Sequence, residues 1–216
     1  MRVARMPLTR ERVIEAAIAL ADESGIDSLS MRRLGQALGV EAMSLYNHVA
    51  NKDDILDGIV DIVLDEVELP DHGAEWKAAL RRTAISMHDA LVRHPWAASL
   101  MLSANRDSEA RMRYMNAILG SLRGGGFSAD MTDHAYHALE SHIFGFTLWI
   151  VGMNLDTASL PDLASAFLER ISTGEYPHLI EHVHQHLKER DPQDEGEFAF
   201  GLDLILDGLE RKRDAA

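Results

Sequence analysis

The sequence predicts an all-α protein, and three observations lead to that prediction. Apolar residues recur at helical spacing in segment after segment, no stretch alternates as a strand would, and glycine or proline separates the segments. The 216 residues are enough for one large or two small domains. We expect a three-helix helix-turn-helix domain in residues 1–52, a connecting fourth helix in residues 53–70, and a helical bundle in residues 71–216.

The first helix is expected from Arg10 to about Glu23. Thr9 can cap its first turn, because a hydroxyl accepts from a free backbone N–H there, and Gly25 can end it in a conformation that suits glycine. The inward stripe of this helix comprises Val13, Ala16, Ala17 and Leu20.

Residues 29–52 are expected to form two short helices that meet at a glycine turn. Ser30 can cap the first of them, Gly39 supplies the left-handed residue that ends it, and Glu41 opens the second. The inward side chains are Leu34, Leu38, Val40, Leu45 and Val49. The outward face of the second helix then carries Ala42, Met43, Ser44, Tyr46, Asn47 and His48. This arrangement is typical of a helix-turn-helix whose second helix is read from outside.

The fourth helix is expected to begin after Asn51, which can cap it, and to run to about Glu68. Lys52 projects from its first turn, and Pro70 ends it. Beyond it, further helices are expected at Glu75–Arg93, after Pro95, and at Ser108–Leu122, Ala129–Asn154, Ser159–Ser172, Pro177–Lys188 and Phe198–Arg211. The helix from Ala129 is apolar nearly all round, so we expect it to be buried on more than one side.

Residues Leu8 to Ile59 resemble the DNA-binding domain of the TetR family of bacterial repressors. The resemblance lies in the Gly-Ile-Asp turn at 25–27, Arg-Arg-Leu at 32–34, Leu-Gly-Val at 38–40, and Leu-Tyr-x-His-Val-x-Asn-Lys at 45–52. It implies that one set of side chains positions the protein on phosphates, namely Thr9, Arg32, Tyr46 and Lys52. It implies that Ala42, Met43, Ser44 and Asn47 face base edges, with His48 on the same DNA-binding surface.

The second half resembles the effector-binding domain of the tetracycline-repressor branch of that family. The matching features are Trp76 with Leu80, the His94-Pro95-Trp96 corner, the Gly126-Phe127 turn and the closing segment GLDLILDGLE. The resemblance implies that residues 71–216 bind an effector and dimerise, and that Ala129–Asn154 and Phe198–Arg211 of two subunits form a four-helix interface. The expected interface residues are His137, Phe144, Leu148, Leu202, Ile205 and Leu209.

The expected effector is small and largely apolar, and no cofactor is expected. Where the tetracycline repressors have an asparagine, an aromatic residue and a metal-binding histidine, this chain has Thr83, Met87 and Met101, which are poor ligands for a magnesium–drug chelate. Methionine and aromatic side chains form adaptable apolar walls. The candidate pocket residues are Met87, Leu91, Trp96, Leu100, Met101, Met112, Met115, Phe144, Leu148 and Trp149, each with core packing as its alternative role.

The sequence therefore predicts a homodimeric, ligand-responsive DNA-binding transcriptional regulator. We expect a repressor released from palindromic operator DNA by a small-molecule effector, with activation of transcription as the alternative. An enzyme is not expected, because no nucleophile elbow or HExxH motif is present. Two other readings stay open: a metal sensor that uses His178, His182 and His186, which recur every four residues, and a helical interaction module without DNA binding.

The charge distribution agrees with DNA binding at the N-terminal end. The net charge is −14, yet residues 1–52 carry seven Lys and Arg against six Asp and Glu, so the excess acid lies in the remainder. The chain contains no cysteine, and no apolar run approaches the roughly 20 residues that span a bilayer. We expect a cytoplasmic protein that does not bind membranes.

Overall fold

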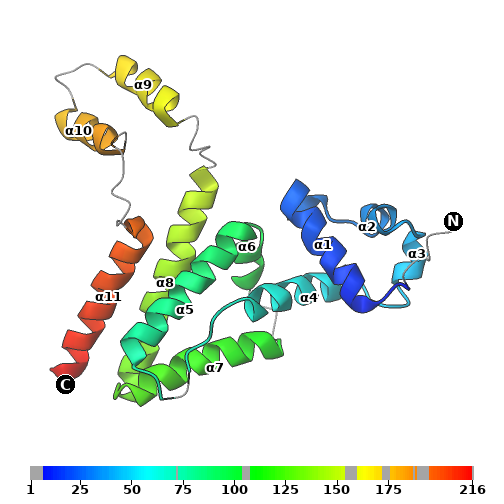
Figure 1. The fold of residues 1–216 in the computed structure, drawn as a ribbon, viewed down its shortest axis with the longest axis horizontal. Coiled ribbons are helices and arrows are strands. Elements are labelled where there is room, and N and C mark those ends of the chain that lie inside the picture. The colour runs from blue at the N-terminus through cyan, green and yellow to red at the C-terminus, as the bar shows by residue number, and fades with distance from the viewer. Residues whose placement is uncertain are drawn as a thin grey trace.

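In the computed structural model, every regular element of the described residues is a helix. The structure describes residues 7–71, 73–103, 108–153, 160–171, 176–186, 188 and 195–215, without the side chains of residues 160, 161 and 186. A small N-terminal group of helices stands at one end, and helix α4 leads from it into a larger bundle (Figure 1). The all-α fold class expected from the sequence is confirmed.

The N-terminal group comprises α1 (Arg10–Ser24), a 3₁₀ turn (Ile26–Ser28), α2 (Met31–Leu38) and α3 (Ala42–Leu45), followed by α4 (Lys52–Asp65). The expected caps are present: the side chains of Thr9, Ser30 and Asn51 each accept a backbone N–H of the first turn that follows them. Gly39 ends α2 with a left-handed φ of 66°. Because these local contacts determine where each helix begins, the starts of α1, α2 and α4 could be predicted from the sequence.

Helix α4 packs against both halves of the molecule. It contacts α1 near its start and α5, α6 and α7 farther along. Its buried side chains are Ile55, Leu56, Ile59, Val60, Val63 and Leu64, and they belong to one hydrophobic cluster that reaches from α1 to α11. The helix ends at Asp65, before the Glu68 expected from the sequence.

The larger bundle comprises α5 (Trp76–Arg93), α6 (Ala97–Met101), α7 (Glu109–Gly124), α8 (Ala129–Met153), α9 (Leu160–Arg170), α10 (Pro177–His186) and α11 (Gly196–Asp214). Helices α5, α7 and α8 pack on one another, and α11 packs on α5 and α8. Helices α9 and α10 contact each other beyond the end of α8, away from the rest of the bundle (Figure 1).

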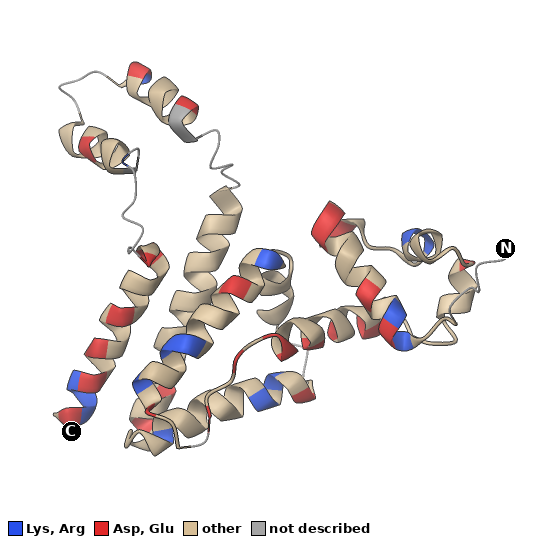
Figure 2. Ribbon diagram, in the orientation of Figure 1, with Lys and Arg blue, Asp and Glu red and all other residues tan. Residues whose placement is uncertain are grey.

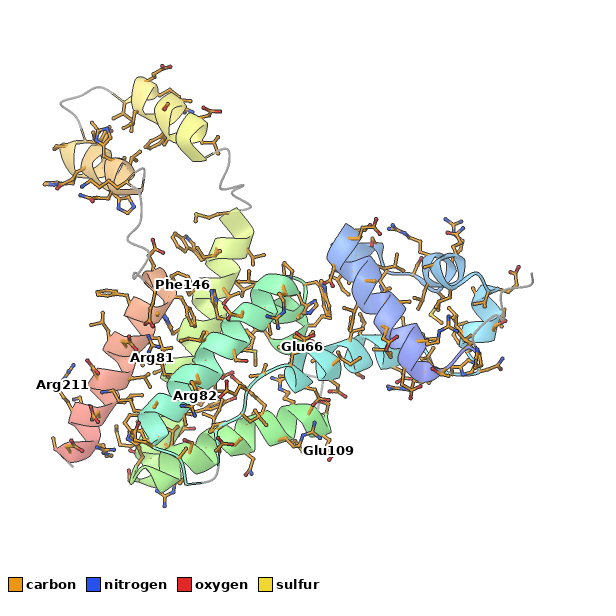
Figure 3. The ribbon with its side chains drawn as sticks, in the orientation of Figure 1. Glu66, Arg81, Arg82, Glu109, Phe146 and Arg211 are labelled. Atoms are coloured by element: carbon orange, nitrogen blue, oxygen red, sulfur yellow. The ribbon has the colours of Figure 1, made fainter. Side chains whose placement is uncertain are left out.

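Ion pairs hold α11 along α5. Lys77 Nζ lies 2.7 Å from Asp207 Oδ1 and 2.6 Å from Glu210 Oε2. One turn farther along α5, Arg81 reaches across to α11 (Figure 3) and lies 2.7 Å from Asp203 Oδ1. These pairs add to the apolar packing of α11 on α5 and α8, in which Phe198, Leu202 and Leu206 are buried.

A charged contact also joins the starts of α1 and α4. Arg10 Nη2 donates to Asp54 Oδ1 at 2.8 Å, and the backbone N–H of Ala50 donates to Asp54 Oδ2 at 2.9 Å. The hydrogen bond from Arg10, followed by the one from Ala50, lowers the pKa of Asp54 below its ordinary value of 3.8. The ionised carboxylate therefore stabilises the folded state.

We predict that Asp54→Asn lowers the free energy of unfolding by about 1 kcal/mol at neutral pH, because a charge-assisted hydrogen bond is lost. The contribution of Asp54 is complete above the ordinary pKa of 3.8 and disappears as the pH falls through the lower pKa of the folded state. Urea unfolding at fixed protein concentration should therefore show the difference between the two proteins shrinking toward acid. The matched control is Glu15→Gln, at an exposed position on α1, and a difference independent of pH would contradict the assignment.

Candidate functional site

The outward face of the helix-turn-helix is formed by α3 and the turn after it. Met43 is 75% exposed and Tyr46 is 46% exposed, and Asn47 is exposed beside them. Ala42, Ser44 and His48 are partly buried at the edges of the same face. Lys52 and Arg32 are exposed, whereas Thr9 is partly buried and its hydroxyl is engaged as the cap of α1. The residues predicted to contact DNA therefore include a compact, accessible face around Met43.

This face is held by close backbone packing between α2 and α3. Leu34 and Leu45 are fully buried, and the backbone N–H of Val40 donates to Gly35 O at 2.9 Å. A Cβ added at Gly35 would lie 2.9 Å from Val40 O and 3.2 Å from the backbone nitrogen of Ala42, so only glycine fits without a shift. The sequence reasoning overlooked Gly35, although a glycine on the inward face of a short helix is itself a sign of close approach.

Charge is distributed unevenly over this end of the molecule. Arginines lie on α2 and at the start of α1, and Lys52 opens α4, whereas the rest of α4 and the far end of α1 are acidic (Figure 2). Positive charge therefore gathers near the face around Met43, where a phosphate backbone would be attracted.

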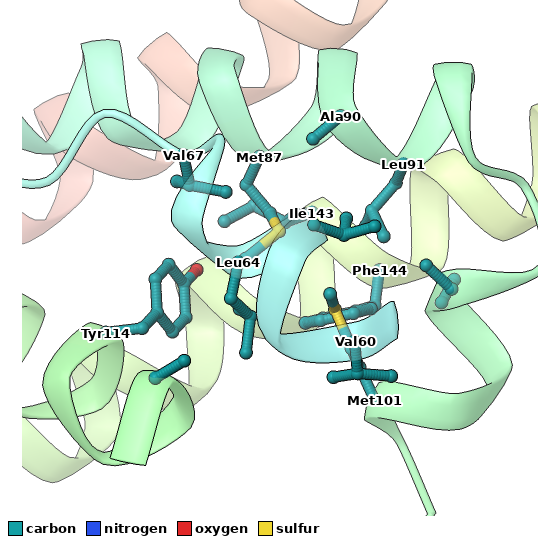
Figure 4. Packing of buried hydrophobic residues seen from close by; sticks show 14 of the residues in the cluster. Val60, Leu64, Val67, Met87, Ala90, Leu91, Met101, Tyr114, Ile143 and Phe144 are labelled. Carbon is teal, nitrogen blue, oxygen red and sulfur yellow. The ribbon is translucent and has the colours of Figure 1, made fainter. Parts of the chain in front are cut away.

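A small cavity lies inside the larger bundle. Its volume is about 50 Å³, well below the roughly 300 Å³ or more of typical small-molecule sites. It is bounded by α4, α5, α7 and α8, with Leu64, Met87, Tyr114 and Phe144 around it (Figure 4). The complete lining is Leu64, Met87, Met101, Leu102, Arg111, Tyr114, Met115, Tyr136, Glu140 and Phe144.

The structure brings four of the ten predicted pocket residues to this cavity: Met87, Met101, Met115 and Phe144. It places the other six elsewhere. Leu91 and Trp96 are buried in the core, and Leu100 is partly buried. Met112, Leu148 and Trp149 were expected in the pocket and are instead 59%, 36% and 55% exposed, because each lies on a side of its helix that the bundle does not cover.

The polar part of the lining was not predicted. Tyr114 is buried, and its hydroxyl donates to Glu140 Oε1 at 2.8 Å, while Tyr136 and Arg111 also border the cavity. Burial raises the pKa of Glu140 and the pKa of Tyr114, and it raises the pKa of Tyr136 to about 12. A glutamate and two tyrosines within an apolar pattern give no clear sequence signal, since the same residues commonly lie on an exposed face.

A larger hollow of about 380 Å³ lies at the surface between the end of α4 and α5. Four of its charged side chains pair with one another: Arg82 Nε lies 3.0 Å from Glu68 Oε1, and Arg93 Nη2 lies 2.7 Å from Glu66 Oε2. It therefore lacks the mostly apolar walls expected of an effector site.

Hydrogen bonds tie the corner before α6 to the N-terminal domain. Trp96 Nε1 donates to Asp22 Oδ1 at 2.7 Å, and His94 Nδ1 lies 2.8 Å from the same oxygen at the far end of α1. His94 Nε2 lies 3.3 Å from Glu66 Oε1, just past the end of α4. Trp96, one of the predicted pocket residues, does not line the cavity, and its indole N–H connects the two domains.

The outer surface of α8 and α11 is apolar. The exposed residues there are Leu148, Trp149 and Met153 on α8 and Phe200 and Leu204 on α11. Of the residues expected at the dimer interface, Leu148 and His137 are exposed, whereas Ile205 and Leu209 are partly buried. Leu202 and Phe144 are buried within the protomer, so the structure removes them from the surface available to a partner.

The histidine-rich α10 was the basis of the metal-sensor alternative. Among the described side chains, no group of three or more His, Cys, Asp or Glu residues could hold a metal ion. His178 and His182 are exposed on α10, and the side chain of His186 lies outside the described residues. Within the part of the chain that the structure describes, no helix is long and apolar enough to cross a membrane.

Comparison with known sequences identifies both halves of the chain. The family described as "Bacterial regulatory proteins, tetR family" matches residues 13–59, and "Tetracyclin repressor-like, C-terminal domain" matches residues 69–213. The tetracycline repressor protein class D of Escherichia coli is 33% identical over 215 residues, which cover 94% of this chain and 89% of the relative. The HTH-type transcriptional repressor DrrR1 of Streptomyces coeruleorubidus is 31% identical, with 94% of this chain and 77% of the relative covered.

Solved structures agree with these sequence relatives. The TetR family protein ActR of Streptomyces coelicolor, in complex with actinorhodin, matches with a TM-score of 0.73 and 27% identity over 96% of this chain and 99% of that one. A single-residue variant of TetR from Acinetobacter baumannii, in complex with minocycline, matches with a TM-score of 0.67 and 27% identity over 95% of each chain. With a helix-turn-helix at one end and a cavity-bearing helical domain at the other, this chain belongs to the TetR family of DNA-binding transcriptional regulators.

Proposed function

We propose that this regulator is a repressor that binds a palindromic operator as a homodimer and leaves it when a small, largely apolar molecule enters the cavity. One observation carries the proposal: Leu64 of α4 lines the cavity, while Lys52 opens the same helix beside the DNA-reading face. The repressors among its relatives, and the ligand complexes of ActR and the Acinetobacter protein, support it. In this proposal, residues 1–52 bind DNA, residues 53–70 connect the two domains, and residues 71–216 bind the effector and dimerise.

The size of the cavity supports a mechanical role for the effector. Because about 50 Å³ is too small for a typical ligand, entry must push the walls apart. Leu64 on α4 and Met101 on α6 are two of those walls. Trp96 precedes α6 and is hydrogen-bonded to Asp22 on α1, so a movement of α6 also pulls on the N-terminal domain.

A tilt of α4 in each subunit would change the separation of the two DNA-reading faces. Two faces enter successive major grooves only when they lie about one helical turn apart, roughly 34 to 36 Å. The effector can act only if it binds more tightly to the conformation in which the two faces have the wrong spacing for DNA than to the conformation that binds operator. A typical coupling of about 1 to 3 kcal/mol would weaken operator binding roughly 5- to 150-fold, and operator would weaken effector binding equally.

The direct test is selection of bound sequences from random duplex DNA by the purified protein. The expected outcome is a palindrome with half-sites about 10 base pairs apart from centre to centre. Recovery of no enriched sequence at low salt would favour the alternative of a helical interaction module.

The contact roles on DNA lead to one prediction. Lys52 should contact phosphate, so Lys52→Ala should weaken binding to all sequences alike and reduce the salt slope by about one unit. Met43 should face base edges, so its replacement should change sequence preference instead. Titrations at several salt concentrations measure both. Lys212→Ala, at the exposed end of α11, is the matched control, and an unchanged slope for Lys52→Ala would show that its role is wrongly assigned.

The exposed apolar face of α8 and α11 leads to a second prediction. Leu204 is 57% exposed on α11, and burial of that face in a dimer would remove it from water. Leu204→Gln should therefore weaken dimerisation by about tenfold or more, as measured by light scattering over a dilution series. The control is Val92→Gln, because Val92 is 45% exposed on α5, outside that face. A wild-type monomer at micromolar concentration would contradict the proposed dimer.

The cavity wall leads to a third prediction. Met101 is buried at the cavity, so Met101→Trp should fill it, push α6 and α4 apart, and lower operator affinity in the absence of effector. The expected loss is roughly 5-fold or more, within the usual range of coupling. Met112→Trp is the matched control, because Met112 is 59% exposed on α7 and does not line the cavity. If both variants bind operator as the wild type does, the cavity is not coupled to DNA binding.

A further inference from the structure

The polar side of the cavity is built around one carboxyl group. Glu140 on α8 borders the cavity, and its Oε1 accepts from the hydroxyl of Tyr114 on α7 at 2.8 Å. Tyr114 is buried, so its hydroxyl is held in place by the surrounding core rather than by water. The carboxyl group is therefore fixed at the cavity wall, in an orientation set by its tyrosine partner.

This carboxyl group has fewer partners among the described residues than an ionised carboxylate can accommodate. An ionised carboxylate can accept about four hydrogen bonds, and among the described residues Glu140 receives one. Removal from water raises the pKa of Glu140, and the bond from Tyr114 and the charges of Arg111 and His137 offset this only in part. The ligand-free cavity thus holds an acidic group that would gain from a further donor or a positive charge.

The other cation at the cavity does not take that place. Arg111 borders the cavity, but no ion pair within 4 Å joins it to Glu140 in the described residues. Arg111 and Glu140 are both partly buried, and burial has the largest effect on the pKa of Glu140, whereas the charge of Arg111 opposes it only as a smaller cause. Arg111 therefore leaves Glu140 able to attract a cationic group of a ligand.

The remaining walls suit an apolar body with a cationic group. Met87, Met101 and Met115 can adjust their shape, and Phe144 and Tyr136 offer aromatic surfaces. Aromatic rings attract cations through their faces, whereas they give no such gain to an anion. Leu102 lines the cavity and is 54% exposed, so the cavity reaches toward the surface beside it.

We propose that the effector is an apolar molecule that carries a basic amine, and that Glu140, oriented by Tyr114, is the residue that selects it. This inference rests on the proposed function, because it assigns the effector of the same cavity. Glu140 acts by direct contact with the ammonium group, and Tyr114 is a positioning residue.

Three probes with one ring system separate charge from shape: naphthylmethylamine, naphthalenemethanol and naphthoate, substituted at the same ring carbon. Their binding to the wild-type protein can be followed by fluorescence at neutral pH. The amine should bind at least about tenfold more tightly than the alcohol, because a hydrogen bond to a buried charge is worth about 1.5 to 3 kcal/mol. The carboxylate should bind most weakly, because it would face Glu140.

The matched variant is Glu140→Gln, which keeps the shape and the acceptor for Tyr114 but removes the charge. It should lose at least about tenfold in affinity for the amine and change little for the alcohol. Glu109→Gln, at an 84% exposed side chain on α7, should leave all three affinities unchanged. Tyr114→Phe should weaken the amine less than Glu140→Gln does, while the alcohol is unaffected.

Equal wild-type affinities for the three probes, or no binding of any of them at millimolar concentration, would overturn the inference without reliance on a variant. An amine preference that persists in Glu140→Gln would also overturn it. Operator release is measured separately with the amine probe. If the amine binds through Glu140 but operator binding is unchanged, the assignment of the cavity stands and the proposed function fails.

Discussion

The apolar packing of α4 against both domains is the constraint on which the rest of the structure depends. Ile55 and Ile59 are buried in its N-terminal part, which contacts α1, and Val60 and Leu64 are buried in the part that meets the bundle. A helix with buried residues at both ends cannot rotate for one domain without rotating for the other. The domains therefore share one core, and in the proposed mechanism a displacement of Leu64 is passed along α4 to the helix-turn-helix.

A second, polar connection runs parallel to α4. Asp22 at the end of α1 accepts from Trp96 and contacts His94, which also contacts Glu66 at the end of α4. Such contacts depend on direction as well as distance, so they add an orientation-specific connection to the apolar packing. His94 and Trp96, before α6, thus contact residues at the ends of both α1 and α4. Helix α6 ends at Met101, which lines the cavity. The cavity and the DNA-reading face are thus connected in two ways: through α4, and through the hydrogen bond between Asp22 and Trp96. Helix α6 contacts α4 and directly follows Trp96.

The helices and caps were predictable because they depend on local contacts. Thr9, Ser30 and Asn51 cap the helices that follow them, as their types and positions indicated. What the sequence could not supply is the rotation of each helix in the bundle. Met112 and Met115 are three residues apart on α7, yet only Met115 reaches the cavity. Leu202 and Leu204 on α11 differ likewise: Leu202 is buried and Leu204 is 57% exposed, because α11 packs on α5 and α8 through one face.

The negative charge of residues 53–216 lowers the free energy that an effector must supply to release the protein from DNA. Residues 1–52 carry a formal charge of about +1 and the remainder about −15, so attraction to phosphate is confined to a small surface. With such a charge distribution, a repressor has little non-specific attraction to DNA. Little then holds it on the operator once the spacing of its two DNA-reading faces no longer matches successive major grooves. A coupling of only about 1 to 3 kcal/mol then suffices for release. The small cavity, the adaptable methionine side chains and the carboxyl group of Glu140, which has one hydrogen-bond partner among the described residues, would allow a ligand to supply free energy of that order.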